Sequence, residues 1–478
     1  MNTIMDNFKK TKIVCTIGPA SNNHSSITRL IKSGMNIIRL NFSHGDIETH
    51  RKTIELIRSI IKELNVNVSI LQDLPGPKIR IGKLDSESYE LKKDDVVLLT
   101  KEDIVGNNKK FSCNHIEVVE SLKENDFIFI NDGRIKLIVE KKAVEGLYLK
   151  VLNSGEIRSH KGMNIPSQNL KINPITDEDI EFINFGIEMD IDFIAASFIR
   201  TKEDILKVKN IINKSGKDIK VIAKIENPVA IKNIDEILEV SHGIMVARGD
   251  LGIETPIEEV ALNQKYLIKK ALSVTKPSIV ATQMLQSMIN NPIPTRAEVT
   301  DITNAIIDGA DAVMLSEETA IGKYPVDSCQ RMRHICLAVE RELDMSVSLN
   351  NIKTCGKIYP ELALSYAAQE IVENLDIKAI VVLTRSGKTA QLISSRRMNK
   401  PIFVFTTNHK VLKHLNLCWG VLPFYLEEIE DDTLLTERVL KIIKEDKLLP
   451  KDSLILITCG TDNSLNISTN KLEVQSIP

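Results

Sequence analysis

The chain has 478 residues, of which 43% are hydrophobic and 26% charged, and 62 basic against 64 acidic residues give a formal net charge of −2. A chain this long exceeds one ordinary core, so we expect about two to four domains. The balanced charge excludes a general basic field for nucleic acid or an anionic membrane, and no apolar run of about 18 residues predicts a membrane span.

The cysteines and the first residues indicate a cytoplasmic protein. The seven cysteines are scattered and form no C-x-x-C pair, which is typical of reduced structural thiols. The opening residues, MNTIMDNFKKTK, contain no apolar segment followed by a small-residue cleavage site, so we expect no signal peptide.

Short apolar runs alternate with helical patterns from the start of the chain, which predicts βα units. We expect strands over 12–18, 36–43 and 68–74, with helices over 26–34 and 46–64 between them.

The pattern changes between about Gly76 and Asn173, where short runs alternate between apolar and polar residues and turns separate them, which predicts antiparallel β structure. After Pro174 the βα pattern returns, with a helix over 176–190 and five apolar strands: DFIAASFI, KVIAKIE, HGIMVARGD, PSIVATQM and AVMLS. Three strands before the insert and five after it predict an α/β fold, a closed (β/α)8 TIM barrel with a small β-barrel domain inserted after strand 3. A doubly wound sheet is the alternative.

A separate α/β domain is predicted at the C-terminal end. A helix that begins at Tyr324 runs into the polar stretch MSVSLNN, which marks a boundary. Beyond it we expect a helix, ELALSYAAQEIVENL, then strand AIVVLT, a helix, strand PIFVFTT and a last strand, SLILITCG. The expected domains are a catalytic barrel (1–75 and 174–345), an inserted β lid (76–173) and a C-terminal α/β effector and oligomerisation domain (346–478).

Polar and charged residues stand at the ends of all but one of the predicted barrel strands, where active sites of this architecture lie. Each has an ordinary interpretation as an exit into solvent, but a barrel brings all of them to one mouth. From the second strand to the eighth they are Arg39, Asn41, Ser43 and His44; Asp73; Ser197 and Arg200; Lys224 and Glu226; Arg248, Gly249 and Asp250; Thr282 and Gln283; and Ser316 and Glu317.

The residue types at this mouth are typical of phosphoryl transfer. Glu226 and Asp250 are hard oxygen donors on adjacent strands, and two carboxylates with waters and substrate oxygens suit Mg²⁺. Arg39, Lys224 and Arg80 are cations that can hold phosphate. The alternative is a ring of salt bridges that closes the barrel.

A turn rich in Gly, Ser and Thr follows strand AIVVLT. SGKT resembles the end of a P-loop, but Val382 stands where the first glycine belongs, so we reject a Walker A motif. The turn is either an anion-binding effector loop at a helix N-terminus or a plain turn. Its residues are Thr384, Ser386, Gly387, Lys388 and Thr389.

At these residues the sequence resembles the pyruvate kinase family. The matching segments, in family order, are TKIVCTIGPAS, IIRLNFSHG, VIAKIEN, IMVARGDLG, IVATQMLQSM, PTRAEVTDITNAIIDGADAVMLSEETAIGKYP and TRSGKTA, with INDG and KGMNIPS in the insert. The resemblance covers essentially the whole chain and implies the reaction phosphoenolpyruvate + ADP + H⁺ → pyruvate + ATP, with Mg²⁺ or Mn²⁺.

The resemblance also implies roles for individual residues. Lys224 stabilises the phosphoryl group in flight, and Glu226 and Asp250 hold the divalent metal. Arg39, the Gly249 amide and Thr282 complete the substrate site, with Thr282 or a water beside it protonating the enolate. Asn41, His44 and Arg80 match contacts to the nucleotide phosphates.

Two positions depart from the family pattern: Glu178 stands where a nucleotide-contacting lysine is often found, and the Gly-rich loop usual before TN near the C-terminus is missing. The resemblance further implies a homotetramer and a phosphorylated effector at the C-terminal domain. A catalytically inactive relative with a binding or regulatory role, or another Mg²⁺-dependent phosphoenolpyruvate or pyruvate barrel lyase, is the alternative function.

The segment LQDLPGPKIR bears on a monovalent cation. Asn41, Ser43, Asp73 and Leu74 match the K⁺ cage of the potassium-dependent branch, but Leu74 offers only a carbonyl, and Lys78 stands where that branch has Glu. A lysine ammonium is a compact charge that can replace the ion. We therefore expect that K⁺ is not required, the alternative being a Lys78 that merely faces solvent.

Overall fold

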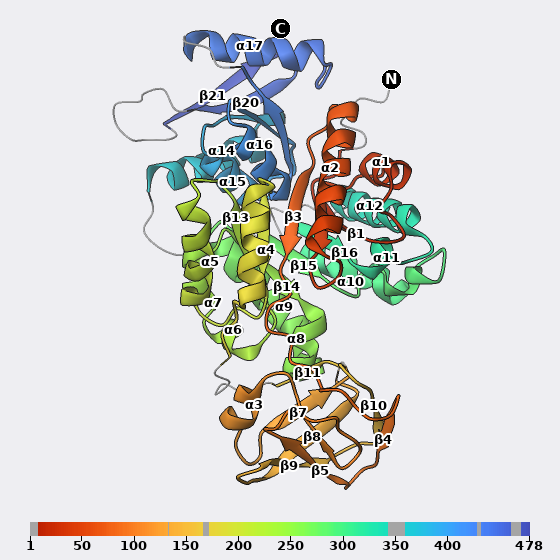
Figure 1. The fold of residues 1–478 in the computed structure, drawn as a ribbon. Coiled ribbons are helices and arrows are strands. Elements are labelled where there is room, and N and C mark those ends of the chain that lie inside the picture. The colour runs from red at the N-terminus through yellow and green to blue at the C-terminus, as the bar shows by residue number, and fades with distance from the viewer. Residues whose placement is uncertain (1–7, 132, 166–171, 343–358, 428–431, 460–469) are drawn as a thin grey trace.

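The computed structural model consists of a closed parallel barrel with a β insert at one end and a second sheet at the opposite end (Figure 1). In the described part of the chain no helix is both long and apolar enough to cross a membrane. The described residues are 8–131, 133–165, 172–342, 359–427, 432–459 and 470–478.

The predicted eight-stranded barrel is confirmed, in the order β1-β2-β3-β12-β13-β14-β15-β16, and it closes where β16 pairs with β1. Most of its strands are buried along their whole length, as parallel strands covered by helices must be. The strands are β1 (Lys12–Ile17), β2 (Ile37–Asn41), β3 (Ser69–Asp73), β12 (Phe193–Ala196), β13 (Lys220–Ile225), β14 (Gly243–Ala247), β15 (Ser278–Ala281) and β16 (Ala312–Leu315).

The helices around the barrel begin at capping residues that the sequence supplies. Asp46 accepts from the Thr49 N–H at the start of α2, and Thr176 and Asp179 cap each other at the start of α4. The elements are α1 (His24–Lys32), α2 (Ile47–Leu64), α4 (Asp177–Glu188), α5 (Lys202–Lys214), α6 (Pro228–Lys232), α7 (Ile234–Val240), α8 (Arg248–Glu254), η2 (Ile257–Glu259), α9 (Val260–Ser273), η3 (Gln286–Ile289), α10 (Arg296–Ile307), α11 (Glu317–Ala320) and α12 (Pro325–Glu342).

The insert contains a six-stranded sheet, β11-β7-β8-β9-β5-β6, and the pair β4–β10. Isolated bridges from Arg80 to Gly162 and from Ile81 to Cys113 link the two ends of the larger sheet, in keeping with the expected small barrel. The elements are β4 (Tyr89–Leu91), β5 (Val96–Thr100), β6 (Lys110–Phe111), α3 (Ile116–Ser121), β7 (Phe127–Ile130), β8 (Ile135–Lys142), β9 (Gly146–Val151), β10 (Gly155–Ile157) and β11 (Met163–Asn164).

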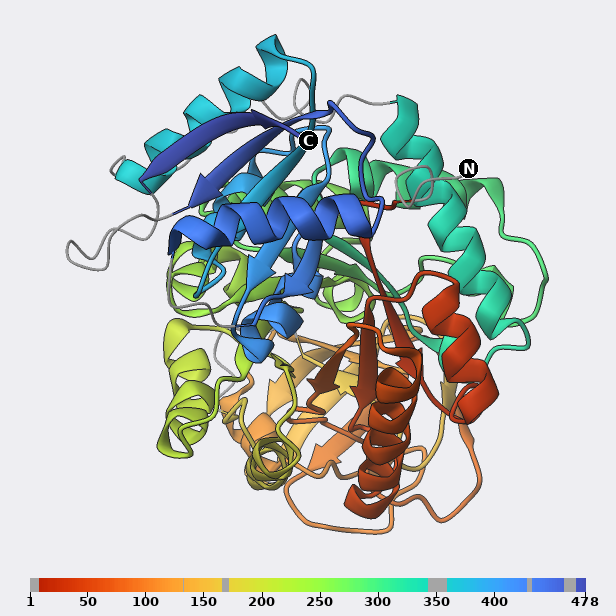
Figure 2. The same cartoon turned by 90° about the horizontal axis from the view of Figure 1, so that it is seen from above.

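The C-terminal part is an α/β sandwich around the sheet β19-β18-β17-β20-β21, with α14 on one face and α17 on the other (Figure 2). The expectation that SLILITCG is the last strand is wrong, because β21 follows it and pairs antiparallel with β20. The elements are α14 (Pro360–Asn374), β17 (Ile377–Leu383), α15 (Lys388–Ser395), β18 (Ile402–Thr406), α16 (His409–His414), η4 (Leu415–Leu417), β19 (Val421–Tyr425), α17 (Asp432–Glu445), β20 (Leu454–Cys459) and β21 (Lys471–Ser476). The predicted boundary at MSVSLNN and the C-terminal loop that departs from the Gly-rich family pattern lie outside the described residues.

The C-terminal part closes the floor of the barrel, opposite the strand ends. Leu417 is buried in the same apolar cluster as inward-facing barrel residues such as Leu71, Phe193 and Ile222. The His414 ring packs edge-on against Phe193, with ring centroids 5.6 Å apart. The barrel therefore takes part of its own core from a distant segment.

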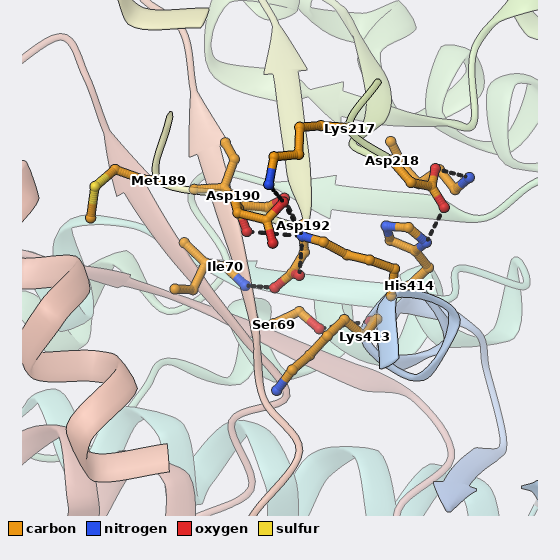
Figure 3. A network of polar contacts seen from close by, with 12 residues as sticks. Ser69, Ile70, Met189, Asp190, Asp192, Lys217, Asp218, Lys413 and His414 are labelled. Atoms are coloured by element: carbon orange, nitrogen blue, oxygen red, sulfur yellow. Dashed lines mark hydrogen bonds and ion pairs between the residues drawn. The ribbon is translucent and has the colours of Figure 1, made fainter. Parts of the chain in front are cut away.

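Polar contacts surround this apolar floor (Figure 3). Lys410 Nζ lies 3.3 Å from an Asp190 carboxylate oxygen and 3.5 Å from one of Asp192, and Ser69 Oγ donates to the Lys413 carbonyl at 2.7 Å. These contacts join α16 to the starts of β3 and β12, so the two parts share one interface.

A buried ion pair lies at a second point of this interface. Arg397, 1% exposed, lies 2.9 Å from Asp311 and donates to the Gly309 carbonyl at 2.8 Å. Its guanidinium also stacks over the ring of Trp419, 5.3 Å from the centroid. Because the pair is buried, loss of one partner leaves an uncompensated charge.

We expect Arg397→Met to lower the free energy of unfolding by about 3–5 kcal/mol, because it leaves the Asp311 carboxylate buried without its cation. The measurement is urea denaturation followed by fluorescence of Trp419, which is the one tryptophan of the chain and is fully buried. The matched control is Lys378→Met, which breaks an exposed ion pair of 2.7 Å with Asp376 and should change stability by less than about 1 kcal/mol. Equal losses in both variants would contradict the assignment.

Candidate active site

A cavity of about 840 Å³ lies at the carboxyl ends of the barrel strands and is lined by both barrel and insert. The structure brings most of the predicted site residues to this cavity: Arg39, Asn41, Ser43, His44, Lys78, Arg80, Lys224, Glu226 and Asp250. The insert contributes residues to which the sequence assigned no role, among them Asn131, Ser159, His160, Lys161 and Asn164. The insert therefore forms one wall of the site.

Lys224 is the centre of the charge arrangement. Its ammonium lies 3.1 Å from Asp73 Oδ1 and 2.9 Å from Glu226 Oε1, two carboxylates that are 1% and 0% exposed. Burial disfavours the charge on Lys224, but these two carboxylates outweigh burial and raise the pKa of the ammonium. Lys224 is therefore held in its charged form.

Arg39 shares Asp73 with Lys224. Its Nε lies 2.6 Å from Asp73 Oδ2, and its Nη1 donates to Thr16 Oγ1 at 3.0 Å. Burial alone would raise the pKa of Asp73, but Arg39 and Lys224 more than offset it and lower that pKa. Asp73 thus lies behind the cavity as an ionised anchor for two cations that face it.

Glu226 and Asp250 lie at the ends of the neighbouring strands β13 and β14, as predicted. Burial raises the pKa of Glu226, Lys224 opposes this effect, and the Asp250 carboxylate adds to it. Glu226 Oε2 accepts from the Phe198 N–H at 2.7 Å, whereas Glu226 Oε1 faces the Lys224 ammonium at 2.9 Å. A buried carboxylate at the cavity, beside a second carboxylate on the next strand end, fits a metal ligand.

The pair of carboxylates favours Mg²⁺ over a metal that needs a full protein cage. The described residues contain no group of three or more His, Cys, Asp or Glu side chains arranged to hold a metal. Mg²⁺ commonly takes one or two carboxylates and completes its octahedron with waters and phosphate oxygens. The donor set therefore fits a cation that binds together with a phosphorylated substrate.

Gly249 and Thr282 do not line the cavity directly but contact each other at the next strand ends. The Gly249 N–H donates to Thr282 Oγ1 at 2.8 Å, and Arg248 Nη2 donates to the Thr282 carbonyl at 2.6 Å. Thr282 has φ +71°, a conformation that threonine seldom adopts and that turns its side chain toward α8. Sequence reasoning placed Arg248 at the mouth without a role; it supports Thr282.

Three of the four residues of the predicted monovalent-cation cage, Asn41, Asp73 and Leu74, have oxygens with protein partners. Asn41 Oδ1 accepts from the Ser43 N–H at 3.2 Å, and the Leu74 carbonyl accepts from Ser197 Oγ at 2.6 Å. The two carboxylate oxygens of Asp73 lie next to Arg39 and Lys224, as described above.

Lys78 lines the same cavity and is half-buried. Burial, with Arg80 and Lys224, lowers the pKa of its ammonium, while the Asp250 and Asp73 carboxylates act in the opposite direction. Lys78 therefore lies within electrostatic range of these cations and carboxylates.

Arg80 extends this cationic rim, and His44 lies beside it. Partial burial lowers the pKa of His44, and the charges of Lys78 and Arg80 lower it further. Glu178, in contrast, is exposed in the first turn of α4 and does not line the cavity.

The predicted effector turn lies between β17 and α15, in the C-terminal part. The Gly387 N–H donates to Thr384 Oγ1 at 3.0 Å and the Lys388 N–H to Ser386 Oγ at 3.4 Å. Gly387 has φ +81°, which the turn into α15 requires and which glycine adopts without strain.

Two family models match the chain: "Pyruvate kinase, barrel domain" over residues 8–329, and "Pyruvate kinase, alpha/beta domain" over residues 362–475. Together they span most of the sequence.

Known proteins resemble the chain along its whole length. A pyruvate kinase of Thermococcus litoralis is 43% identical over 98% of this chain and 99% of its own, and one of Thermotoga maritima is 40% identical over 98% and 100%. The crystal structure of a pyruvate kinase from Cryptosporidium parvum superimposes with a TM-score of 0.93 at 34% identity, over 98% of this chain and 96% of that one.

Proposed function

Since the chain belongs to the pyruvate kinase family, which transfers a phosphoryl group from phosphoenolpyruvate to ADP in glycolysis, we propose that the residues around Lys224 carry this reaction out. The observation that carries the assignment is the charged Lys224 between buried Asp73 and Glu226 at the cavity.

Lys224 is the catalytic cation. In phosphoryl transfer the negative charge spreads over the equatorial oxygens of the moving group, so a fixed positive charge beside it lowers the barrier. The raised pKa of Lys224 keeps its ammonium charged over the whole physiological pH range. Arg39, on the same anchor, holds the phosphate from a second side.

Glu226 and Asp250 would hold the divalent cation that family membership implies, and we assign it as Mg²⁺ or Mn²⁺. When bound, this cation supplies charge neutralisation between the two carboxylates and the substrate oxygens. The burial of Glu226 at the cavity, with Asp250 on the neighbouring strand end, supports this assignment.

The Gly249 amide and Thr282 complete the phosphoenolpyruvate site. When substrate displaces the Thr282 hydroxyl, the Gly249 N–H becomes free to donate to a substrate oxygen. Thr282, or a water beside it, delivers the proton that turns the enolate into pyruvate. Asn41, His44 and Arg80 at the cavity wall bind the phosphates of ADP and ATP.

The domain roles follow from the position of this cavity. The barrel (1–75 and 174–345) carries the chemistry, the insert (76–173) closes over it as a lid, and the C-terminal domain (346–478) carries effector binding and oligomerisation. The insert residues that line the cavity support the lid, since water must be excluded during transfer.

We propose that the enzyme does not need K⁺. Protein partners already lie at oxygens of Asn41, Asp73 and Leu74, and Lys78 supplies a positive charge near Asp73. A bound K⁺ would have to compete with these partners for the cage oxygens. It would also add little, because Lys78 already supplies a positive charge at this place.

Assembly and regulation complete the proposal. Ile257 (73% exposed) and Leu262 (66% exposed) are apolar side chains that a contact between subunits of a homotetramer would cover. The turn at Gly387 precedes a helix and supports a phosphorylated effector at the C-terminal domain.

The cysteines that the structure describes are all free, which supports a cytoplasmic location.

We expect ADP-dependent pyruvate formation from phosphoenolpyruvate with Mg²⁺ and its loss on chelation, measured by coupling to lactate dehydrogenase. Addition of Mg²⁺ after chelation should restore the rate. Pyruvate formation without ADP would indicate a barrel lyase, and no pyruvate in any condition would indicate an inactive relative.

Lys224→Met should lower kcat by about 10²- to 10³-fold, because it removes the cation beside the transferring group. KM for phosphoenolpyruvate should change by less than about threefold, since Arg39 and the metal still hold the ground state. The same coupled assay measures both constants. Lys232→Met, on the exposed end of α6, is the matched control, and near-normal turnover of Lys224→Met would exclude the assigned role.

Lys78→Glu should lower the activity in K⁺-free buffer by about tenfold or more, since a unit charge some 4–8 Å away contributes roughly 2–4 kcal/mol at an effective dielectric near 20. K⁺ should restore part of that activity. The measurement is kcat/KM at constant ionic strength with tetramethylammonium replacing K⁺.

The control for this charge reversal is Lys83→Glu, an exposed lysine of the insert that should leave both activity and K⁺ response unchanged. Strong activation of the unmodified enzyme by K⁺ would overturn the proposal.

A further inference from the structure

We propose that Ser197 is a positioning residue for Lys224, and that the strand end Ser197–Phe198 fixes the catalytic cation and the metal-binding carboxylate of Glu226 together. This inference rests on the proposed function of Lys224 and Glu226. The sequence places Ser197 at the end of a barrel strand but gives it no role.

Ser197 determines the direction of the Lys224 ammonium. Lys224 Nζ donates a hydrogen bond to Ser197 Oγ at 2.5 Å. Asp73 Oδ1 and Glu226 Oε1 lie 3.1 and 2.9 Å from the same nitrogen as its counter-charges. The carboxylates thus keep Lys224 charged, while Ser197 orients it.

The Ser197 hydroxyl is itself oriented. Its proton points to the Leu74 carbonyl, 2.6 Å away, so a lone pair of Oγ is left to face Lys224. Ser197 is buried at the end of β12, and Leu74 follows β3, which pairs with β12. A chain of two hydrogen bonds therefore connects the catalytic lysine to the loop that follows Asp73.

Phe198 positions the proposed metal ligand Glu226. Its backbone has φ +53°, an unfavourable conformation for a bulky residue, and in it the N–H donates to Glu226 Oε2 at 2.7 Å. That donor takes one oxygen of Glu226 and leaves Oε1 toward Lys224 and the cavity. Two successive residues thus fix the lysine and the carboxylate relative to each other.

This arrangement matters when ligands bind. A divalent cation held by Glu226 and a phosphoryl group at Lys224 would both compete with the ion pair between these side chains. The bond to Ser197 then keeps the ammonium from turning away. The strand end preserves the distance between the two charges that must act on the same phosphoryl group.

Ser197→Ala should lower kcat by about ten- to hundredfold, because small misplacements of a catalytic group cost rate, while KM for phosphoenolpyruvate stays within about threefold. Ser197→Thr keeps the hydroxyl and should recover most of kcat. Ser197→Cys keeps nearly the volume of serine but accepts weakly, so it should lose kcat with unchanged thermal unfolding. In a Lys224→Met background, Ser197→Ala should cost less than about twofold more, because its effect passes through the lysine.

The matched control is Ser278→Ala, which removes a hydroxyl equally buried at the start of β15, where Oγ has no hydrogen-bond partner among the described residues. Its turnover should be unchanged. Normal kcat in both Ser197→Ala and Ser197→Cys, or equal losses from Ser197→Ala with and without Lys224, would overturn the inference. An unmodified enzyme that forms no pyruvate would instead refute the proposed function itself.

Discussion

The active site depends on one constraint, which is that Lys224 and its two carboxylate neighbours are charged groups almost without access to water. Buried charges are costly unless they are paired, and Asp73 and Glu226 pair with Lys224 on two sides. The phosphorylated substrate brings further negative charge into this site. A bound divalent cation and the basic residues at the rim of the cavity must offset that charge. Substrate, metal and protein side chains therefore form one electrostatic unit.

The barrel geometry brings the buried charges close enough to pair, and the sequence encodes this geometry as apolar strands with polar residues at their ends. Parallel strands bring their carboxyl ends to one mouth, so residues far apart in the chain, such as Arg39 and Lys224, converge on Asp73. Two residues at the strand ends have a strained backbone, since Phe198 and Thr282 both have positive φ and both donate to or accept from groups of the site. The rigid strands hold these two residues in backbone conformations that they would not adopt in an isolated peptide.

Apolar runs separated by helical patterns were enough to predict the barrel, the insert and the mouth residues, because fully buried parallel strands leave a strong signal. Two strands of the C-terminal sheet escaped prediction for physical reasons. Both are edge strands: β19 contains Pro423, and β21 has no buried stripe along it. The role of Ser197 and the left-handed Phe198 depend on contacts between strands, which no local pattern of residues records.

The floor of the barrel has a consequence for synthesis of the chain. The last barrel strand ends at Leu315, but Leu417, which completes the apolar interior, follows roughly 100 residues later. During translation the barrel strands are therefore complete before α16 and η4, which close the base of the barrel, have been made. Until that segment has been made, the apolar side chains at the base lack Leu417, which covers them in the folded protein.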